Sequence, residues 1–594
     1  MISRITLRSD IVRKFWKLLS QVERRRTVVL ITLMFIGTGL EMLGIGLVLP
    51  ALALIARPDY ANSHPAIGSL LNVVGNPSQN ALVIGGMLVL VCVYAVKALF
   101  FTFFSWYQFR LAFGLRAAWS TRLFSIYLQQ PYTFHLQRNS AQLIQNISGQ
   151  VDQFANGIFI PTMSMLVEGL VFAGLISMLI VVEPVGTVIL VCVLSIVAFS
   201  FYWATRRKLL QWGTAAQYHE GLRFQHLMQG LGGAKDVKIL GREEEFLAQY
   251  GHHSSQSARI SRWQLTFQQL PRLWLELLAV VGLAALVITM LAQGLPLVAI
   301  LPTLAMFAAA AFRLLPAVNR ILVTTQVLKF GWPIIENLHA EFNLPLPTAN
   351  VSNSAQFRAT LEIRDVVYTY AGAKQRALDN ISLTIQCGEC VGFVGSSGAG
   401  KSTLVDILLG LLVPDVGKVY VDGNEIVGNP RQWQDQIGYV PQSIFLTDDS
   451  LRRNVAFGLP NAQIDEAAVR RALHVAQLEE FVNALPSGLD TLVGERGIRL
   501  SGGQRQRIGI ARALYHDPAV LVLDEATSAL DMATERGVMD AVKVLQGSKT
   551  VVIVAHRLST VQNCKRIYRL EKGRLVDVEL KKSAAQGKVE EKLP

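Results

Sequence analysis

The chain has 594 residues and a formal net charge of +13, a length that fits about three or four domains of ordinary size. Hydrophobic residues make up 51% and charged residues only 17%, whereas about 25% of an average soluble protein is charged, so the composition argues against an entirely soluble fold. The positive charge is compatible with nucleic acid, but the basic clusters flank apolar runs, as cytoplasmic loops of membrane proteins do, and no nucleic acid partner is expected.

Residues 1–26 are charged and amphipathic, and they lack the apolar core and cleavage site of a signal peptide. They predict a helix that lies on the cytoplasmic surface of the membrane. Long apolar runs follow, and crossing the hydrocarbon takes about 20 apolar residues. These runs predict six transmembrane helices, at Thr27–Ala56, Ala81–Leu111, Gly157–Val182, Gly186–Thr205, Leu273–Gln293 and Leu295–Thr325.

The connections between these helices differ in length. Glu183-Pro184 and Gln293-Gly294 predict short external turns, while the long connections at 112–156 and 206–272 are interpreted as cytoplasmic continuations of the helices. The external connection 57–80 contains apolar residues at helical spacing between Ala66 and Gly75. This short helix either rests on the membrane or contacts a lipid, and its spacing alone favours the first interpretation.

Charged residues inside the predicted membrane helices are informative, because each costs a few kcal/mol near the bilayer centre unless it faces protein or water. Arg313 and Arg320 are seven residues apart, which places them on one helix face about 10 Å apart. Two cations on one face suggest a wet cavity that accepts an anion. The alternative is that they pair with Glu168 or Glu276, or reach the headgroups. The full set is Glu41, Lys97, Glu168, Glu276 and Arg313, with Arg272 and Arg320 nearer the helix ends.

Residues 341–358 carry Pro, Asn and Ser with little periodicity and predict a linker. The pattern G-x-x-x-x-G-K-[ST] then follows an apolar strand and precedes an apolar helix. In such a P-loop the backbone N–H groups hold phosphates, Lys401 reaches the β- and γ-phosphates, and the Ser402 hydroxyl binds Mg²⁺. The sequence therefore predicts ATP and Mg²⁺ as ligands of Gly395, Ser396, Ser397, Gly398, Ala399, Gly400, Lys401, Ser402 and Thr403.

Five cysteines are present, and none falls in a predicted external loop, so no disulfide framework is expected. The motif CGEC, Cys387 to Cys390, could indicate a metal or redox site. It has no second pair at zinc spacing, and it enters an apolar strand. We therefore interpret these cysteines as strand residues.

The stretch VLVLDE, Val520 to Glu525, predicts a buried strand that ends in two carboxylates. Asp524 is suited to hold Mg²⁺, and Glu525 to polarise the attacking water as general base. Upstream, LSGGQRQR places Ser501, Gly502 and Gly503 at the start of a helix, where a hydroxyl and free N–H groups make a second anion site. Two phosphate sites so far apart in one sequence suggest that they serve different ATP molecules, as in a dimer.

Together with YVPQ, SALD (Ser528 to Asp531) and AHRLST, these motifs resemble, in the same order, the nucleotide-binding domain of ABC transporters. The resemblance covers the whole ATPase half. It implies that Tyr370 stacks on adenine, that Gln442 contacts Mg²⁺ and that His556 contacts the γ-phosphate. Glu525 and His556 are then the expected catalytic residues, and Gln504 and Asp531 join the nucleotide-binding residues.

The resemblance also implies an architecture, the type IV ABC exporter fold. It assigns residues 1–340 to a membrane α-helical domain of six transmembrane helices, 359–580 to an α/β P-loop NTPase domain and 581–594 to a charged C-terminal tail. One membrane half with one ATPase makes half a transporter, so a homodimer with two ATP at its interface is expected. The stretches Gln130–Asn139 and Gly230–Phe246 correspond to the coupling helices of this family.

Stretches of the membrane half, among them GLEMLGIGLVLPALALI and FRLLPAVNRIL, are similar to bacterial flippases of lipid-linked oligosaccharides. That resemblance implies ATP-driven flipping of a polyprenyl-pyrophosphate-linked oligosaccharide to the outer leaflet of the bacterial inner membrane. It implies basic cavity positions at Lys97, Arg272, Arg313 and Arg320, and a contact between 66–75 and the polyprenyl tail. The alternatives are an exporter of another lipid, a drug or a peptide, and an ATP-gated channel or regulator, against which the intact Glu525 argues.

Overall fold

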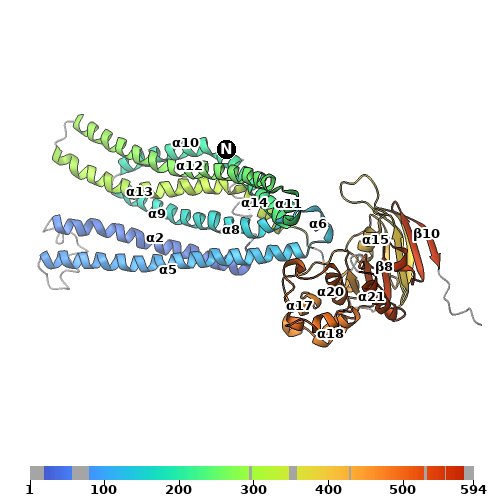
Figure 1. The fold of residues 1–594 in the computed structure, drawn as a ribbon. Helices are drawn as coiled ribbons and strands as arrows, with labels where there is room; N and C mark the ends of the chain where they lie inside the picture. The colour runs from blue at the N-terminus through green and yellow to red at the C-terminus, as the bar shows by residue number, and fades with distance from the viewer. Residues whose placement is uncertain are drawn as a thin grey trace, which may run out of the picture. The chain divides into compact units, whose positions relative to one another are not determined.

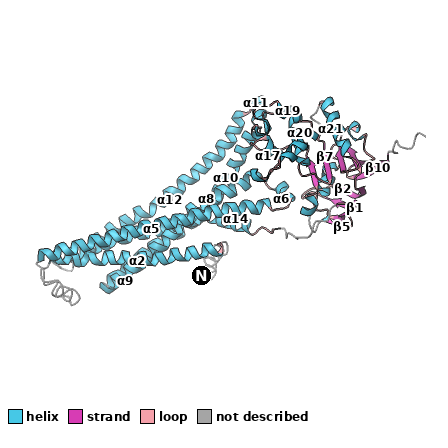
Figure 2. Cartoon of the chain, turned by 90° about the horizontal axis from the view of Figure 1, so that it is seen from below, coloured by secondary structure: helices cyan, strands magenta, loops and turns pink. Residues whose placement is uncertain are grey.

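The computed structural model describes residues 16, 19–56, 79–182, 184–292, 297–346, 357–426, 430–527, 531–555 and 557–580. The predicted helix at 66–75, the tail at 581–594 and most of the predicted surface helix at 1–26 lie outside the described residues. Contacts divide the chain into two units, residues 1–130 with 134–346 and residues 131–133 with 347–594. The first unit is helical, and the strands belong to the second (Figure 2).

Long helices that run beside one another build the first unit (Figure 1). Short helices and two π-helical turns join some of them. The helices are α2 (Gln21–Ala56), α5 (Gln79–Leu128), α6 (Tyr132–Gln137), α7 (Ser140–Gln145), η1 (Asn146–Gln150), α8 (Val151–Phe154), η2 (Ala155–Phe159), α9 (Ile160–Val182), α10 (Pro184–Gly232), α11 (Ala234–Leu240), α12 (Glu243–Ala292), α13 (Leu297–Phe330) and α14 (Trp332–Phe342).

Each of the six predicted transmembrane helices coincides with a long helix, namely α2, α5, α9, α10, α12 or α13. Within the described residues, four helical stretches are long and apolar enough to cross a membrane: Gln21–Gly44, Asn80–Leu128, Ser140–Val181 and Glu243–Ala292. The prediction that helices continue into the long connections is confirmed, because α5 runs to Leu128 and α10 to Gly232.

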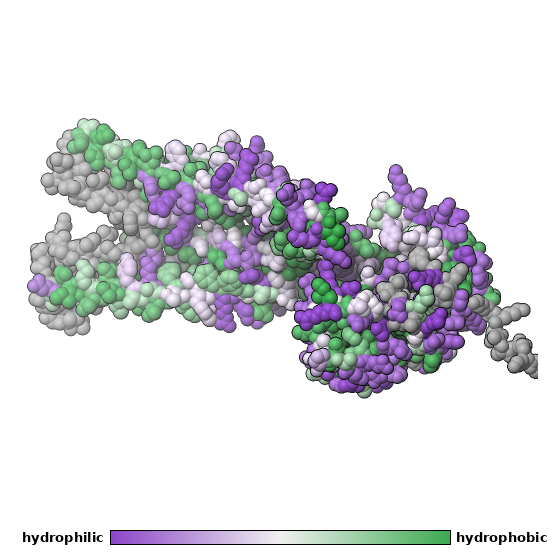
Figure 3. Space-filling view, in the orientation of Figure 1, coloured by the Kyte–Doolittle hydropathy of each residue, from purple (hydrophilic) through white to green (hydrophobic). Residues whose placement is uncertain are grey.

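Apolar side chains on these helices face outward. Ile84, Leu88 and Leu99 of α5 are 61%, 64% and 73% exposed. The visible face of the helical unit carries many apolar residues, and polar residues become more frequent towards the end that bears α11 (Figure 3). An exposed apolar surface of this extent is what a lipid-embedded helix bundle requires.

The polar end of the unit has its own aromatic core. Trp119 of α5 is 2% exposed and stacks on Phe154 with ring centroids 4.6 Å apart. The ring of Phe342 meets it edge-on at 5.3 Å. Leu338, also on α14, is 1% exposed in the same cluster. This packing fixes α14, the last described helix of the first unit, against α5 and α8.

The second unit contains two sheets. The four-stranded sheet has the order β2-β1-β4-β5, and the six-stranded sheet has the order β10-β9-β3-β8-β7-β6. The strands are β1 (Thr360–Tyr368), β2 (Leu378–Gln386), β3 (Cys390–Gly395), β4 (Val416–Val421), β5 (Asn424–Glu425), β6 (Ile437–Val440), β7 (Val520–Asp524), β8 (Thr550–Val554), β9 (Arg566–Glu571) and β10 (Arg574–Leu580).

Helices in the connections complete this unit. The α-helices are α15 (Lys401–Leu408), α16 (Pro430–Gln434), α17 (Leu451–Val455), α18 (Glu466–Val475), α19 (Glu479–Asn483), α20 (Gly502–Leu514), α21 (Met532–Leu545) and α22 (Leu558–Val561). The 3-10 turns are η4 (Asn461–Gln463), η5 (Gly488–Asp490) and η6 (Glu495–Gly497).

Strands β6, β7, β8 and β3 run parallel, and their sequences are short, nearly continuous apolar runs. Such runs are typical of parallel strands that are buried on both faces, and every residue of β7 and β8 is buried. Cys390 opens β3 and is buried, which confirms the strand interpretation for it, whereas Cys387 is exposed in the turn before β3.

Candidate functional site

The residues assigned to ATP hydrolysis gather at the carboxyl edge of the six-stranded sheet. Phe393 of β3 and Asp524 of β7 both pair with Val554 of β8, so the three strands end in the same row. The P-loop leaves β3 at this edge, and Glu525 follows Asp524 directly. Gln442 comes two residues after β6, and its Nε2 donates to Glu525 Oε2 at 2.8 Å. Parallel pairing thus unites residues from three separate motifs.

Two of the predicted motifs are only partly visible. His556 lies outside the described residues, two positions after the last residue of β8. Ser528 to Leu530 also lie outside them, while Asp531 is described. Burial lowers the pKa of the Arg507 guanidinium, and the charge of Asp531 opposes that shift. Asp531 is therefore close to α20, the helix that follows the LSGGQ serine.

The P-loop lysine is directed into its own loop. Gly400 precedes α15 with φ of 100°, and a Cβ there would lie 2.6 Å from the carbonyl oxygen of Ala377. Lys401 is 5% exposed, and its Nζ donates to the carbonyl oxygens of Gly395 and Ser396 at 2.9 and 3.0 Å. Burial lowers the pKa of this ammonium. The loop therefore holds a positive charge inside a ring of backbone, as a phosphate site requires.

The oxygen donors beside this loop fit Mg²⁺. Asp524 is 7% exposed at the end of β7, Ser402 is the second residue of α15, and Gln442 carries an amide oxygen. Mg²⁺ prefers such hard oxygen ligands and usually completes its shell with waters and substrate phosphates. Among the described residues, no group of three or more His, Cys, Asp or Glu is arranged to hold a metal. This donor set therefore suits an ion that arrives with a nucleotide, where it would neutralise phosphate charge.

The backbone of Glu525 has an uncommon conformation. Its φ is 50°, in the left-handed region that residues other than glycine rarely adopt, at a cost of about 1–3 kcal/mol. Its N–H donates to the carbonyl oxygen of Val554 at 3.0 Å, which holds the turn in place. At this turn the chain leaves the direction of β7. The Glu525 carboxylate then accepts the hydrogen bond from Gln442.

Tyr370 lies beside the P-loop helix. Its hydroxyl is 3.1 Å from Thr403 Oγ1, and its ring meets that of Tyr368 edge-on at 5.1 Å. The side chain remains partly accessible, since Tyr370 is 36% exposed. A ring in this position, next to the phosphate loop and open to solvent, can stack on a nucleotide base.

We expect Tyr370→Ala to weaken ATP binding about tenfold, because base–aromatic stacking contributes about 1–3 kcal/mol. Tyr370→Phe keeps the ring and should bind ATP within about twofold of the unchanged protein. Equilibrium binding of radiolabelled ATP to the purified protein measures both. If the phenylalanine variant loses as much affinity as the alanine variant, the hydroxyl and its Thr403 contact matter and the ring does not.

The LSGGQ serine caps a helix. Ser501 Oγ accepts from the Gln504 N–H at 3.2 Å, and Gln504 Oε1 accepts from the Ser501 N–H at 2.8 Å. This reciprocal capping box starts α20, whose first two residues are Gly502 and Gly503. Ser501 is exposed, so the positive end of the α20 dipole faces the outside of this unit.

Asp406 of α15 is a titratable group that the motif analysis did not select. Burial raises the pKa of its carboxyl from 3.8 to about 6, and the nearby charge of Asp524 adds to the shift. Because the folded-state pKa exceeds the unfolded-state value, the folded protein binds this proton more tightly. Stability is therefore lost as the pH rises from about 4 to about 6.

We expect Asp406→Asn to raise the midpoint of thermal unfolding of the ATPase domain by a few degrees above pH about 6, and to change nothing below pH about 4. The asparagine removes a charge that is costly only where wild-type Asp406 is ionised. Thermal scans of the full chain without Mg²⁺, across this pH range, measure the effect. Asp448→Asn, at an exposed aspartate, is the matched control. An equal rise of the unfolding midpoint below pH about 4 and above pH about 6 would contradict the raised pKa of Asp406.

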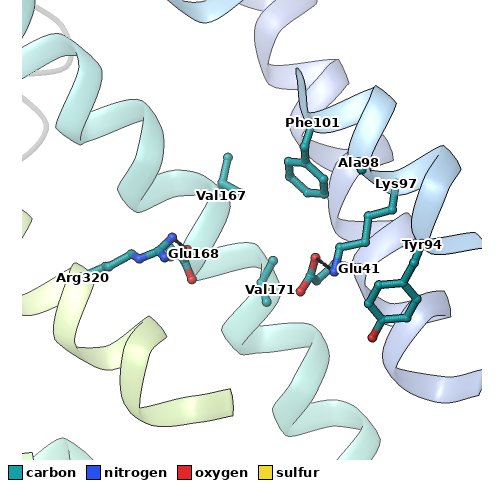
Figure 4. A pocket seen from close by; sticks show the side chains of 9 residues that line it. All are labelled: Glu41, Tyr94, Lys97, Ala98, Phe101, Val167, Glu168, Val171 and Arg320. Carbon is teal, nitrogen blue, oxygen red and sulfur yellow. Dashed lines mark hydrogen bonds and ion pairs between the residues drawn. The ribbon is translucent and has the colours of Figure 1, made fainter. Parts of the chain in front are cut away.

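A second site lies within the membrane unit. An open cavity of about 380 Å³ is lined by side chains from four helices, α2, α5, α9 and α13 (Figure 4). Two ion pairs face it. Lys97 Nζ is 2.7 Å from Glu41 Oε2, and Arg320 Nη1 donates to Glu168 Oε1. The lining residues are Glu41, Tyr94, Lys97, Ala98, Phe101, Val167, Glu168, Val171 and Arg320.

The structure separates the four predicted cavity cations. Lys97 and Arg320 line one cavity, and Arg320 pairs with Glu168, the alternative left open above. Arg272 pairs with Glu276 on α12, Nε to Oε1 at 2.8 Å, and does not line this cavity. The Arg313 side chain lies outside the described residues. Sequence reasoning gave no role to Glu41, although a charge inside a span signals a partner.

The chain matches known families in both halves. Residues 378–528 match the ABC transporter family, and residues 66–315 match the ABC transporter transmembrane region. The ATP-dependent lipid A-core flippase of Thiobacillus denitrificans is 31% identical over 476 residues, which are 80% of this chain and 81% of the relative. That of Chromobacterium violaceum is 31% identical over 477 residues, 80% of each chain.

A solved structure of a bacterial Atm1-family ABC exporter with ATP bound has the same fold, with a TM-score of 0.77. Its sequence is 23% identical, and the match covers 94% of this chain and 96% of that chain. The predicted exporter architecture is thereby confirmed. The chain belongs to the ABC transporter family and is an exporter half-transporter, a multi-pass membrane protein in which an ATPase is coupled to transport.

Proposed function

We propose that two copies of this chain form a homodimer that uses ATP and Mg²⁺ to move a lipid with an anionic headgroup from the cytoplasmic to the outer leaflet of the bacterial inner membrane. The observation that carries this proposal is the exposed cation Arg320 in a cavity among membrane helices. Relatives that are about 30% identical are named lipid A-core flippases, which supports a lipid as the cargo.

The ion pair of Arg320 with Glu168 lies within predicted transmembrane helices. Glu168 is eleven residues after the start of the predicted span Gly157–Val182, about 16 Å along the axis. Arg320 is five residues before the end of the predicted span Leu295–Thr325, about 8 Å from it. A charged headgroup crosses hydrocarbon only if polar groups replace its water, and a guanidinium offers a planar fork of donors to phosphate oxygens. A headgroup could therefore bind at Arg320 inside the membrane while the lipid tails stay in the hydrocarbon.

The ATPase residues would act across the dimer. The P-loop with Lys401 would bind the phosphates, and the exposed Ser501 end of α20 in the other copy would cap the γ-phosphate. Glu525 would accept the proton of the attacking water, with Gln442 holding its carboxylate by the 2.8 Å contact. His556 would contact the γ-phosphate. Closure of two such sites would then rearrange the membrane cavity.

For the cargo, our specific proposal is a polyprenyl-pyrophosphate-linked oligosaccharide. It joins an apolar tail to a dianionic pyrophosphate link, which matches apolar helices around a cavity that contains Arg320. The likeness of the membrane half to oligosaccharide flippases supports it, and the named relatives support a second candidate, another anionic lipid such as a phosphorylated glycolipid. Both share the requirement for a phosphate-bearing headgroup.

Purified protein in liposomes, with its ATPase domains outward, tests the proposal. A fluorescent polyprenyl-pyrophosphate oligosaccharide in the outer leaflet should become protected from an external quencher when ATP and Mg²⁺ are added. No protection should develop without ATP or with Glu525→Gln. If labelled phosphorylated glycolipid alone is moved, the second candidate replaces the first. If only an uncharged drug is moved, the proposal fails.

A further inference from the structure

The two ion pairs of the membrane cavity differ in the exposure of their side chains. The Lys97 side chain is 19% exposed and that of Glu41 is 6% exposed. Lys97 Nζ also lies 5.0 Å from the centre of the Tyr94 ring, so its ammonium has a carboxylate and an aromatic face beside it. This pair joins α2 to α5, and although both residues line the cavity, their charges are largely shielded from an entering anion by each other and by the ring.

In the other pair, only the arginine side chain is largely exposed. The Arg320 side chain is 65% exposed, while that of Glu168 is 15% exposed. In Figure 4 Arg320 reaches from α13 towards Glu168 on α9, and the carboxylate belongs to the wall. Nη1 of the guanidinium donates to Glu168, and a guanidinium has five N–H donors in all. An anion entering the cavity can therefore approach Arg320 from its open side.

We propose that Glu168 is a built-in counter-ion that competes with the lipid headgroup for Arg320, and so restricts the cavity to headgroups that carry phosphate. The inference rests on the proposed function, because it assumes that the cavity takes an anionic lipid. Glu168 acts on the cargo through Arg320 and is a positioning residue for specificity.

The competition between Glu168 and an entering anion is electrostatic. A carboxylate bonded to one nitrogen of Arg320 offsets its positive charge and repels a second anion at the same guanidinium. Two like charges held a few ångströms apart in a partly desolvated cavity repel each other more strongly than they would in water. A phosphate, with two oxygens placed for the fork and with higher charge, can overcome that competition. A neutral headgroup gains too little from Arg320 to displace the carboxylate.

The competition should also assist release. A headgroup held by Arg320 alone would leave slowly, whereas Glu168 can retake the guanidinium as the cavity changes shape. Removing the carboxylate should therefore tighten binding and slow turnover together. A residue that only stabilises the fold would not lower KM and kcat at the same time.

The binding test uses the homodimer in nanodiscs of neutral phosphatidylcholine, with farnesyl pyrophosphate as probe and farnesol as its uncharged match. Wild type should bind the pyrophosphate more tightly than farnesol. Glu168→Gln should bind the pyrophosphate about tenfold more tightly than wild type and farnesol equally well. Glu168→Asp, which keeps the carboxylate, should behave as wild type. The Arg320→Gln/Glu168→Gln double variant leaves no charge unbalanced and should lose the preference for pyrophosphate.

The inference is overturned if Glu168→Gln, still dimeric and active as an ATPase, binds farnesyl pyrophosphate no more tightly than wild type. Should that variant fail to fold, Glu168→Asp and the double variant still decide, because a double variant that prefers pyrophosphate as strongly as wild type also overturns it. Failure of the proposed function has a separate signature. Wild type would then move no phosphate-bearing lipid in the liposome assay, whatever residue occupies position 168.

Discussion

Glu525→Gln is expected to slow ATP hydrolysis by about 10²- to 10³-fold while leaving ATP bound, because the amide cannot accept the proton of the attacking water. Glutamine has the same shape as glutamate, so the contact of 2.8 Å with Gln442 and the P-loop around Lys401 should persist. Release of inorganic phosphate from purified protein measures the rate, and filter retention of labelled ATP measures occupancy.

The matched control is Glu480→Gln, the same chemical change at an exposed glutamate of α19. It should hydrolyse ATP at the wild-type rate. Hydrolysis at that rate by Glu525→Gln as well would show that another group takes the proton. Loss of both hydrolysis and ATP binding would instead indicate that the substitution disturbs the strained turn at position 525.

Neutralising Arg320 of the cavity together with Arg313, the other predicted cavity cation on α13, is expected to lower ATP-dependent lipid flipping at least about 100-fold, because a desolvated phosphate that loses its charged partner loses about 2–5 kcal/mol. The variant is Arg313→Gln/Arg320→Gln with Glu168→Gln added, so that the Arg320 partner is not left charged beside a neutral side chain. Flipping of labelled pyrophosphate lipid in liposomes measures the loss. ATP hydrolysis without lipid should persist, since these residues belong to the membrane unit.

Arg272→Gln/Glu276→Gln is the corresponding control. It removes an ion pair of the same type from the same membrane unit, but one on α12 whose residues do not line the cavity. We expect flipping within about twofold of wild type. If this control fails and the cavity variant flips normally, the lipid path follows α12 and the cavity has another role.

The ATPase site could be predicted from the sequence because its chemistry resides in short local motifs. The P-loop, YVPQ and VLVLDE motifs each come at the end of an apolar run that becomes a parallel strand, and the carboxyl ends of parallel strands lie at one edge of the sheet. Gln442 and Glu525 are 83 residues apart, yet their positions after β6 and β7 place them in contact. The pKa of Asp406 was not predictable in this way, because it arises from burial beside Asp524 in the folded domain.

The membrane cavity was only partly predictable. The spans and their charged residues could be identified, but which charges meet depends on helix rotation and on packing between distant segments. Arg320 and Glu168 are 152 residues apart, and no local spacing selects Glu168 over Glu276 as the partner. Arg272 and Glu276, by contrast, are at i,i+4 on one helix, so helical periodicity alone could have identified that pair.

The sharing of each ATP site between two copies is tested most directly by complementation. One copy carries Lys401→Ala and the other Ser501→Arg, each with its own affinity tag, and tandem purification isolates the mixed dimer. Each variant alone should hydrolyse almost no ATP. The mixed dimer has one site with an intact P-loop and an intact partner serine, and should recover roughly half of the wild-type rate. A mixed dimer as inactive as its parents, or a monomer that hydrolyses ATP at the full rate, would contradict the account.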